Sequence, residues 1–391
     1  MAATEMISSV DNNNQFFEGV EKLIEIWFTP AKNADLRKIT RQQWENMLKI
    51  VRCEIISFTQ SEQVDAYVLS ESSMFVSRRR WILKTCGTTT PLRCVRALLA
   101  LARDAAGHAR VHNVFYSRRE FARPHQQLQP HDSFDSEVEL LDSFFGDGRA
   151  YTLGPENDYW YLYTLLPLEV DKRVRWADAP VLYEGAPRLL RAGGAPRYAG
   201  DARRTPIGTV DALEKEQRDS ADSELTEPDQ TIEILMSDLD PAVMDIFTRA
   251  HSADAAQATR DSGIDKIIPG MVIDDFLFEP CGYSMNGVAK DGCYMTIHVT
   301  PERSCSYVSF ESNVPVASYD DVVARVLDAF RPNKFVVTVF ATPDSPGAGA
   351  ASGARDLKQL PSLGAYSQLD AAQCRFAGYA LQYALYCKFP S

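Results

Sequence analysis

The sequence predicts an α+β fold in which antiparallel sheet is covered on its outer faces by helices. Short runs rich in β-branched and aromatic residues outnumber the segments with helical periodicity. Many of these runs are joined by short links rather than by helical crossovers, which favours antiparallel over parallel sheet. The chain has 391 residues and is 45% apolar, enough for one large domain or two packed halves.

Runs with strand character occur along most of the chain. Each is short and rich in the residue types that strands prefer. The two halves, about 1–170 and about 228–391, share an outline of several such runs with a helical segment after them, without a clear sequence repeat. The runs are 64–69, 74–84, 111–117, 159–165, 231–236, 272–278, 293–299, 305–311 and 335–341.

Several segments have the start signals and the periodicity of amphipathic helices. Thr40 and Gln43 form a capping-box pattern in front of an apolar run. A Thr-Pro pair at 90–91 and an Asp-Pro pair at 240–241 open two further segments, because proline is favoured in the first helical turn. Ser318 precedes another segment with apolar residues at helical spacing.

Residues 171–227 differ in composition from the rest of the chain. Arg, Gly, Ala and Pro dominate the first part and acidic residues the last part, and few apolar residues recur at either period. This composition is typical of a surface segment without a packed core. We therefore expect a flexible insertion between the two halves, and a tolerated loop is a simpler interpretation than a regulatory element. Residues 342–378 also contain a loop-like run of Pro, Gly, Ala and Ser.

Composition and charge argue against several functions. The formal net charge of −12 disfavours a nucleic-acid surface and is compatible with a cationic ligand. No stretch reaches the about 18 to 20 apolar residues that cross a bilayer, and residues 1–15 lack the features of a secretory signal. The eight cysteines include no CxxC pair, which favours reduced thiols in a cytoplasmic protein. The histidines form no HExxH motif, so we expect no metal site.

Residues 69–75, Leu-Ser-Glu-Ser-Ser-Met-Phe, place a short polar stretch between two strand-like runs. Taken alone, this stretch is most simply a hairpin turn. A serine in a strained backbone has another option, because its hydroxyl can attack the preceding carbonyl carbon and convert the amide into an ester. Elimination then breaks the chain and leaves a dehydroalanine, which hydrolyses to a pyruvoyl group. That ketone can serve as an electron sink in place of pyridoxal phosphate.

The sequence around this stretch favours the second option. YVLSESSMFVSRRRWILKTCGTT (67–89) closely resembles the processing and active-site segment of the eukaryotic, pyruvoyl-dependent S-adenosylmethionine decarboxylase proenzymes. The resemblance implies a four-layer αββα sandwich, two antiparallel sheets with helices on the outer faces. It continues in FFEGVEKLIEIWF (16–28), FYSRREF (115–121), DYWYLYTL (158–165), PDQTIEILMSDLDPAVMD (228–245), LFEPCGYSMNG (277–287), TIHVTPE (296–302) and SYVSFESN (306–313).

By this resemblance, the chain cleaves itself between Glu71 and Ser72 into chains 1–71 and 72–391. Ser72 then becomes the pyruvoyl group that forms a Schiff base with the substrate.

The resemblance also implies the groups that act on this bond and on the substrate. His298 removes the α-proton that collapses the ester, and Ser284 hydrogen-bonds the intermediate. Cys86 returns a proton to the substrate α-carbon after carbon dioxide has left. Ser73, Glu18 and Glu21 match further residues of the same site.

The substrate-binding residues follow from the same motifs. Phe17 and Phe278 match the pair that sandwiches adenine, and their faces can attract the sulfonium charge, a contribution of about 0.5–2 kcal/mol. Glu302 matches the carboxylate that binds both ribose hydroxyls, and Leu69 offers backbone groups to adenine.

A second group of residues is acidic. Along a strand, Asp229, Thr231 and Glu233 project from one face, which would put two carboxylates inside a sheet sandwich. Buried like charges are costly unless a cation compensates them. The resemblance identifies a putrescine site here, and we expect the diamine to stimulate activity. The residues it implies are Glu25, Lys84, Phe115, Arg118, Asp229, Thr231, Glu233, Glu311, Phe340 and Tyr379.

The sequence thus predicts a self-processing enzyme that converts S-adenosylmethionine to carbon dioxide and decarboxylated S-adenosylmethionine, the aminopropyl donor for spermidine and spermine. We also expect a cytoplasmic homodimer of processed protomers, with no nucleic-acid or membrane partner.

One alternative is a non-catalytic paralogue that activates or scaffolds a partner subunit. Such copies usually lose the processing serine, the proton donor or the processing histidine, and this chain keeps all three. The other is a Cys–His hydrolase on Cys86 and His298, for which the sequence identifies no oxyanion hole.

Overall fold

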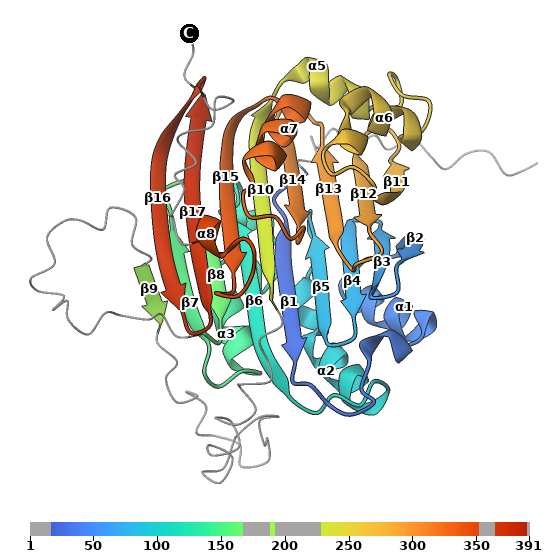
Figure 1. The fold of residues 1–391 in the computed structure, drawn as a ribbon, viewed down its shortest axis with the longest axis vertical. Helices are drawn as coiled ribbons and strands as arrows, with labels where there is room; N and C mark the ends of the chain where they lie inside the picture. Colours follow the sequence, from blue (N-terminus) through green and yellow to red (C-terminus); the bar gives the residue numbers. More distant parts are fainter. Residues whose placement is uncertain (1–16, 167–187, 192–227, 352–363, 389–391) are drawn as a thin grey trace, which may run out of the picture.

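The computed structural model describes residues 17–166, 188–191, 228–351 and 364–388. Within them, two antiparallel sheets of nine and eight strands face each other (Figure 1). With the edge strand β9 (Arg188–Arg191) set aside, the two sheets have the same strand order: the first strand of each half lies in the middle, between the fifth and the sixth. The two halves of the chain therefore share one topology.

The first sheet is formed by the N-terminal half. Its central strand β1 (Lys22–Phe28) pairs with β5 and β6, with Leu23 opposite Lys84 and Glu25 opposite Phe115. All residues of β1 are buried, because the sheet is covered on both faces. Across the sheet the strands are β2 (Ile55–Gln60), β3 (Val64–Leu69), β4 (Ser72–Ser77), β5 (Arg80–Thr85), β1, β6 (Val111–Arg119), β8 (Trp160–Thr164), β7 (Arg149–Leu153) and β9.

The second sheet is formed by the C-terminal half around β10 (Gln230–Leu239). This strand pairs with β14 and β15, with Glu233 opposite Glu311 and Thr231 opposite Phe340. Across the sheet the strands are β11 (Val272–Leu277), β12 (Tyr283–Val288), β13 (Tyr294–Thr300), β14 (Tyr307–Ser312), β10, β15 (Pro332–Ala341), β17 (Tyr379–Lys388) and β16 (Tyr366–Phe376).

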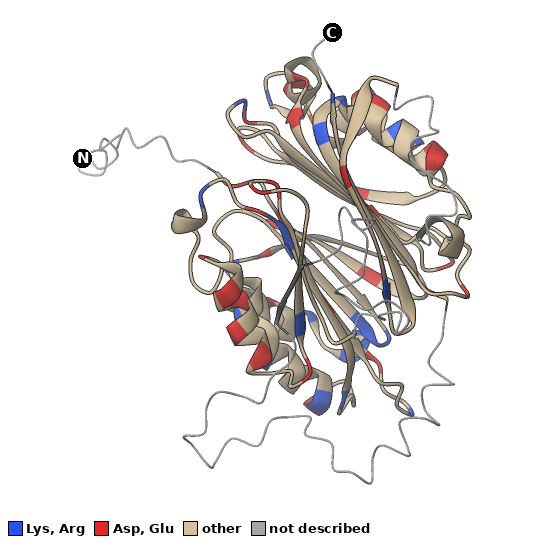
Figure 2. Ribbon diagram, turned by 90° about the vertical axis from the view of Figure 1, so that its left-hand side faces the viewer, with Lys and Arg blue, Asp and Glu red and all other residues tan. Residues whose placement is uncertain are grey.

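Helices cover the outer face of each sheet, so the molecule has four layers (Figure 2). One core lies between the first sheet and its helices, and another between the second sheet and its helices. Two further clusters lie between the sheets. The helices are α1 (Arg41–Ile50), α2 (Val95–Asp104), α3 (Phe134–Asp142), α5 (Pro241–Met244), α6 (Ala255–Ser262), α7 (Asp320–Phe330) and α8 (Ala348–Ala351), with 3-10 turns at Leu36–Lys38, Pro91–Cys94, Pro124–Gln126, Asp245–Phe247 and Ile264–Lys266.

The predicted α+β class and the sandwich of antiparallel sheets are confirmed. The capping box is present at the start of α1, where Thr40 and Gln43 bond each other's backbone N–H groups. The Thr-Pro signal at 90–91 marks a 3-10 turn that leads into α2, and Asp240 caps the short helix α5.

Three segments differ from the sequence prediction. The single run expected at 74–84 is two strands, β4 and β5, which pair across a short turn. Within the segment that was expected to be an insertion, β9 pairs with β7, whereas residues 171–187 and 192–227 lie outside the described residues. The loop-like region 342–378 contains β16, a strand with intermediate or exposed positions over much of its length at the sheet edge.

No helix in the described part of the chain is long and apolar enough to cross a membrane.

Candidate active site

A tight hairpin carries the expected cleavage point. Strands β3 and β4 pair through Leu69 and Ser72, so only two residues form the turn between them. Ser70 anchors this turn to Glu54, whose carbonyl accepts a bond of 2.9 Å from the Ser70 N–H. Ser72 has a φ of +144°, a value that residues with a side chain rarely adopt. The backbone is therefore strained at the residue after the Glu71–Ser72 bond.

The carbonyl oxygen of Glu71 is held by two donors from one residue. The backbone N–H of Cys86 lies 3.1 Å from it and the Cys86 thiol 3.4 Å. Both donors polarise the carbonyl, as the donors of an oxyanion hole do. Burial, together with the carboxylates of Glu71 and Glu21, raises the pKa of the Cys86 thiol well above its usual value. Cys86 therefore stays protonated and can act as a proton donor.

Gly87 fixes the backbone next to Cys86. Its N–H donates to the Glu18 carbonyl at 2.9 Å, and its own carbonyl accepts a bond of 2.8 Å from the Lys22 ammonium. With a φ of +61°, this position favours glycine. A Cβ here would lie 2.8 Å from the ring of Phe17, so the aromatic side chain packs directly against the loop that carries Cys86.

Glu21 joins the hairpin to the other sheet. One of its carboxylate oxygens accepts a hydrogen bond from the Ser72 hydroxyl and lies 3.9 Å from Nε2 of His298. The other oxygen lies 3.5 Å from the Lys84 ammonium. Burial alone would raise the pKa of Glu21, but Lys84, His298 and the hydroxyls of Ser72 and Ser309 outweigh it and lower the pKa. A carboxylate thus lies beside the hydroxyl of Ser72.

Glu18 also lies near this loop. Its carboxylate accepts a bond of 3.3 Å from the Arg123 backbone N–H, and burial raises its pKa.

His298 and Ser284 are direct partners on adjacent strands β13 and β12. Nδ1 of His298 lies 2.9 Å from the Ser284 hydroxyl, and Nε2 lies 2.9 Å from the Thr296 hydroxyl. Burial is the largest of the effects that lower the pKa of His298 to about 4. The imidazole is therefore neutral near pH 7 and can accept a proton.

Ser73 links the hairpin to the facing sheet as well. Its hydroxyl lies 2.7 Å from the side-chain oxygen of Asn286 and 3.4 Å from the Thr296 hydroxyl. Ser73 therefore connects β4 to β12 and β13, the strands that carry Ser284 and His298.

Cys305 connects two of the residues expected to bind the substrate. Cys305 donates from its thiol to the Phe17 carbonyl at 3.2 Å and from its N–H to the Glu302 carbonyl at 3.0 Å, so it ties these two residues together. One buried oxygen of Glu302 has no hydrogen-bond partner among the described residues, which fits a site for ligand hydroxyls. Phe278 is half-buried and makes an edge contact with Phe276 at 4.8 Å. Leu69 is buried at the end of β3.

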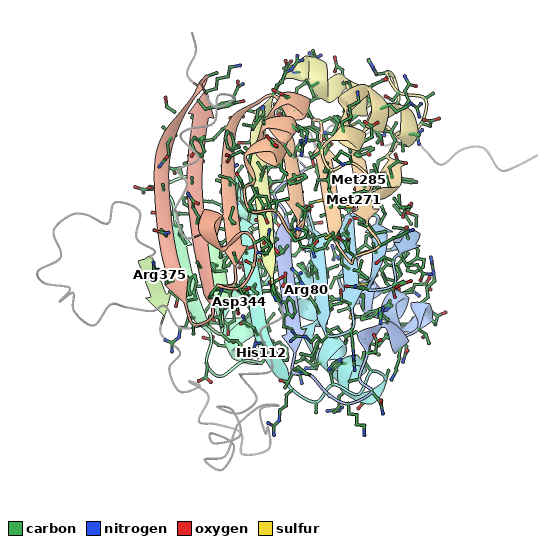
Figure 3. The ribbon with its side chains drawn as sticks, in the orientation of Figure 1. Arg80, His112, Met271, Met285, Asp344 and Arg375 are labelled. Carbon is green, nitrogen blue, oxygen red and sulfur yellow. The ribbon has the colours of Figure 1, made fainter. Side chains whose placement is uncertain are left out.

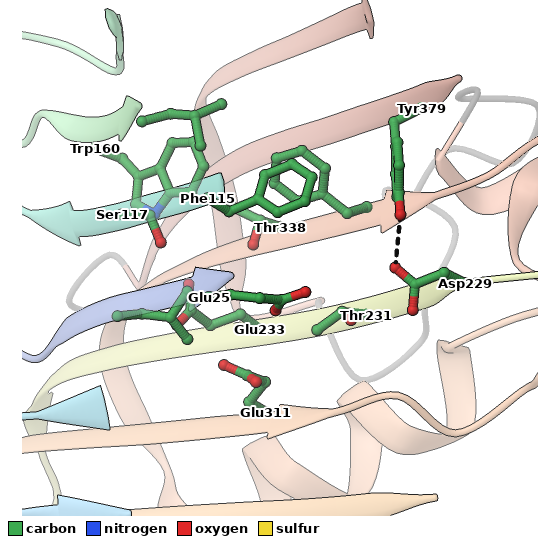
Figure 4. Close-up of a pocket in the computed structure, with 13 residues that line it drawn as sticks. Glu25, Phe115, Ser117, Trp160, Asp229, Thr231, Glu233, Glu311, Thr338 and Tyr379 are labelled. Carbon is green, nitrogen blue, oxygen red and sulfur yellow. Dashed lines mark hydrogen bonds between the residues drawn. The ribbon is translucent and has the colours of Figure 1, made fainter. Parts of the chain in front are cut away.

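An acidic cavity lies between the two sheets (Figure 4). Carboxylates form one side of it and aromatic side chains the other. Tyr379 closes one end, with its hydroxyl 3.1 Å from Asp229. The lining residues are Leu23, Glu25, Phe115, Ser117, Trp160, Leu162, Asp229, Thr231, Glu233, Glu311, Thr338, Phe340 and Tyr379.

Two buried cations contact the acids of this region. The Lys84 ammonium lies 2.7 Å from Glu311 and 3.1 Å from Glu233, in addition to its contact with Glu21. Burial alone would lower the pKa of Lys84, but these three carboxylates raise it well above its usual value. The Arg80 guanidinium lies 2.8 Å from Glu25 and 3.5 Å from Asp229.

The acids nevertheless outnumber the cations. Burial, followed by the charges of Glu311 and Glu21, raises the pKa of Glu233 to about 7 although Lys84 opposes the rise. Burial also raises the pKa of Glu25, against the effect of Arg80. In the described part of the chain, five carboxylates share Lys84 and Arg80, which leaves three negative charges uncompensated when all are ionised.

Most of the residues assigned from the sequence lie together, and Arg118 is the exception. Phe115 faces the cavity from β6, whereas Arg118 lies on the helix side of that strand and pairs with Glu137 of α3 at 2.8 Å. Residues an odd number apart in a strand point to opposite faces, so Phe115 and Arg118 cannot share the cavity.

Sequence reasoning missed several contributors. The cavity also includes Ser117, Trp160 and Thr338, and Arg80 pairs with two of its acids. Residues an even number apart in a strand share a face, so Ser117 could have been identified from Phe115, and Arg80 from Lys84. Among the described residues, no group of three or more His, Cys, Asp or Glu side chains is placed to hold a metal ion.

Comparisons with known proteins place the chain among one family of proteins over most of its length. The sequence profile of the family described as adenosylmethionine decarboxylase matches residues 14–387. The chain is 46% identical over 381 residues to the S-adenosylmethionine decarboxylase proenzyme of Drosophila melanogaster, an alignment that covers 96% of this chain and 97% of that protein. It is 44% identical over 335 residues to the proenzyme of Xenopus laevis, with 84% of each chain covered.

A solved structure has the same fold. The AdoMetDC-delta26 monomer of Trypanosoma brucei superimposes with a TM-score of 0.52 at 22% identity, and the match covers 81% of this chain and 99% of that one. The profile spans nearly the whole chain, and relatives that share more than two fifths of its residues align over most of their length. The chain therefore belongs to the adenosylmethionine decarboxylase family.

Proposed function

We propose that this protein cleaves its own chain between Glu71 and Ser72 and then decarboxylates S-adenosylmethionine. The observation that carries the proposal is the environment of Ser72: a strained backbone, a carboxylate on its hydroxyl, and two donors on the preceding carbonyl. The family to which the chain belongs, and the names of its relatives, support the same activity.

The first step is attack by the Ser72 hydroxyl oxygen on the carbonyl carbon of Glu71. The carboxylate of Glu21 accepts the hydroxyl hydrogen bond, and the Cys86 N–H stabilises negative charge on the carbonyl oxygen. The C–N bond breaks, the Ser72 nitrogen takes up the hydroxyl proton to become a free amine, and an ester forms between the Ser72 oxygen and the Glu71 carbonyl carbon. Relief of the unusual φ at Ser72 favours this rearrangement.

The second step breaks the ester. Removal of the α-proton of Ser72 expels the Glu71 carboxylate and leaves a dehydroalanine, which water converts to a ketone with loss of ammonia. His298 is the base in this proposal because its imidazole is neutral and lies 3.9 Å from the Glu21 oxygen that binds the Ser72 hydroxyl. Ser284 orients the ring through Nδ1.

The residues around position 72 fit the pyruvoyl group that this cleavage would produce. When present, it supplies a ketone that binds the substrate amine and withdraws electrons as carbon dioxide leaves. Cys86 holds a protonated thiol beside this position and returns a proton to the substrate α-carbon. Phe17 lies next to Gly87, so adenine stacked on its ring is held close to Cys86.

Glu302 supports the nucleoside end of the substrate. One buried oxygen of its carboxylate has no partner among the described residues and can accept hydrogen bonds from the hydroxyls of a ribose. Phe278 lies at the start of the connection between β11 and β12.

The acidic cavity is proposed to bind putrescine. A linear diamine carries two positive charges on a flexible apolar stem, and four carboxylates line the cavity opposite aromatic side chains, two more than the buried cations Lys84 and Arg80 that contact them. Lys84 connects this cavity to the reaction site, because it contacts Glu233 and Glu311 on one side and Glu21 on the other. A bound dication would therefore alter the charge around Ser72, which supports stimulation by the diamine.

The test is the state of the purified chain. We expect a denaturing gel and intact mass to give chains 1–71 and 72–391, the larger with a pyruvoyl end group, and carbon dioxide to be released from carboxyl-labelled S-adenosylmethionine. Ser72→Ala should remain one chain without activity, whereas Ser70→Ala, in the same turn, should still cleave. A single wild-type chain, with or without putrescine, would favour the non-catalytic paralogue. Cleavage without carbon dioxide release would contradict the decarboxylase proposal.

The assembly and the location of the protein stay predictions. Sedimentation of the cleaved protein would check for a homodimer, and fractionation of expressing cells would check for a cytoplasmic protein.

A further inference from the structure

Arg80 is a buried arginine between the two sheets, near the centre of the molecule (Figure 3). Its guanidinium packs over two aromatic rings, 4.9 Å from the centre of Trp27 and 5.6 Å from the centre of Tyr294. Contact with both rings restricts its position, and a buried arginine keeps its charge. Burial alone would lower the pKa of Arg80, but Glu25, Tyr294 and Asp229 raise it well above its usual value.

Arg80 and Tyr294 separate two cavities. The acidic cavity lies on one side, where Arg80 bonds Glu25 at 2.8 Å and the Tyr294 hydroxyl bonds Glu311 at 2.6 Å. A smaller cavity lies on the other side, and both Arg80 and Tyr294 line it together with residues such as Phe75 and Ile82. The two side chains, together with the acids Glu25 and Glu311 that they bond, therefore form the wall between the cavities.

The charges on this wall oppose a longer cation. Arg80 already pairs with Glu25 and Asp229, so these two carboxylates have a resident partner. A triamine that reached past a diamine would place its third ammonium at this wall, beside the guanidinium. Repulsion between two buried cations, and the space that the guanidinium itself fills, would both disfavour it.

We propose that Arg80, braced by Trp27 and Tyr294, makes the acidic cavity selective for a linear diamine over longer polyamines. Arg80 occupies the position and supplies the charge that a third ammonium would otherwise provide. Removal of its side chain opens space between the two cavities and leaves Glu25 and Asp229 without their cation, which favours a ligand with one more positive charge. This inference rests on the proposed diamine function of the cavity.

The experiment compares putrescine with spermidine, its triamine extension, as ligands of the full-length protein by calorimetry. For the wild type we expect putrescine to bind at least about tenfold more tightly than spermidine, as expected when a cation must approach a buried like charge. In Arg80→Ala this ratio should fall at least about tenfold or reverse. Arg80→Gln, which removes the charge but keeps more of the side chain, should lower the ratio by a smaller factor.

The matched control is Arg119→Ala. Arg119 is as buried as Arg80, with 7% of each residue exposed, and it also bridges the sheets, but its contacts are Ser237 and Asp158, neither of which lines the acidic cavity. This variant should keep the wild-type ratio.

The outcomes distinguish the two proposals. If wild-type protein does not bind putrescine, the diamine function of the cavity fails. If putrescine binds but the ratio is unchanged in Arg80→Ala, the selectivity role of Arg80 is wrong. If Arg80→Ala does not fold, Arg80→Gln decides in its place, and an unchanged ratio there also overturns the role.

Discussion

Cys86 donates two hydrogen bonds to one atom, the carbonyl oxygen of Glu71: its backbone N–H at 3.1 Å and its thiol at 3.4 Å. The contact spans from the end of β5 to the turn before β4. It brings the proposed proton donor of the catalytic reaction to the bond that the protein is proposed to cleave. One residue therefore serves both reactions, through different groups.

Replacement of Cys86 by alanine separates these two contributions. The backbone N–H is retained, and a thiol is a weak donor, so Cys86→Ala should still cleave, about tenfold more slowly at most. Decarboxylation per mole of cleaved chain should fall about 10²–10⁴-fold, the usual effect of removing a general acid. Gel densitometry and carbon dioxide release measure the two rates. Cys387→Ala, at a free cysteine near the end of the chain, serves as the control. A folded Cys86→Ala that does not cleave would show that the thiol dominates.

Lys84 compensates three buried carboxylates, so its loss should destabilise the protein strongly. Lys84→Met should lower the free energy of unfolding by about 3–5 kcal/mol, because Glu21, Glu233 and Glu311 would lose their shared cation. Urea unfolding measures the change. Putrescine should recover part of it by supplying positive charge. Lys38→Met, at an exposed lysine, should change stability by no more than about 0.5 kcal/mol. If Lys84→Met lowered the free energy of unfolding by no more than the Lys38→Met control does, the charge balance proposed for the cavity would be contradicted.

Diamine binding should depend on pH through Glu233. Its pKa of about 7 is raised by burial and neighbouring acids, so the carboxyl is partly protonated at neutral pH. A dication favours the ionised form, so binding should release protons near pH 7 and the affinity should fall as the pH drops below 7. Without ligand, the stability of the fold changes with pH in the opposite direction. Because the pKa of Glu233 is raised in the folded state, ionisation of this carboxyl lowers the free energy of unfolding progressively as the pH rises from about 4.5 to 7. Calorimetry in buffers with different ionisation enthalpies counts the released protons. Glu233→Gln should abolish most of the release, and proton uptake by the wild type would refute the assignment.

Gly87→Ala should weaken substrate binding. The new Cβ would lie 2.8 Å from the Phe17 ring, and a φ of +61° costs a residue with a side chain about 1–2 kcal/mol. Displacement of Phe17 should raise KM for S-adenosylmethionine several-fold and lower kcat less. The control is Gly146→Ala, because a Cβ at Gly146 meets nothing within 4 Å. An unchanged KM in Gly87→Ala would mean that Phe17 does not stack on the substrate.

Local patterns in the sequence were sufficient for a large part of the fold. The capping box at Thr40 and Gln43 identified the start of α1, because it depends only on residues three apart. The strand β1 was missed as an element, although its residues were recognised by resemblance. Both of its faces are buried, so it lacks the alternation of apolar and polar residues that marks a half-exposed strand.

Alternation within a strand determined which acids could meet. Asp229, Thr231 and Glu233 share a face by their spacing alone, and the structure places all three on the acidic cavity. The same rule, applied to β6, separates Phe115 from Arg118 and so corrects the one residue that resemblance had assigned to the wrong face.

The sequence by itself thus determined the fold class, the serine turn as the candidate reactive element through its resemblance to a known family, and the set of acids that could form a site. Only the tertiary structure decided which cations meet those acids. Lys84 and Glu233 are 149 residues apart, and Arg80 and Tyr294 are 214 apart. Their contacts depend on how the two sheets are set against each other, and that is decided by packing of the apolar residues between the sheets rather than by any local pattern.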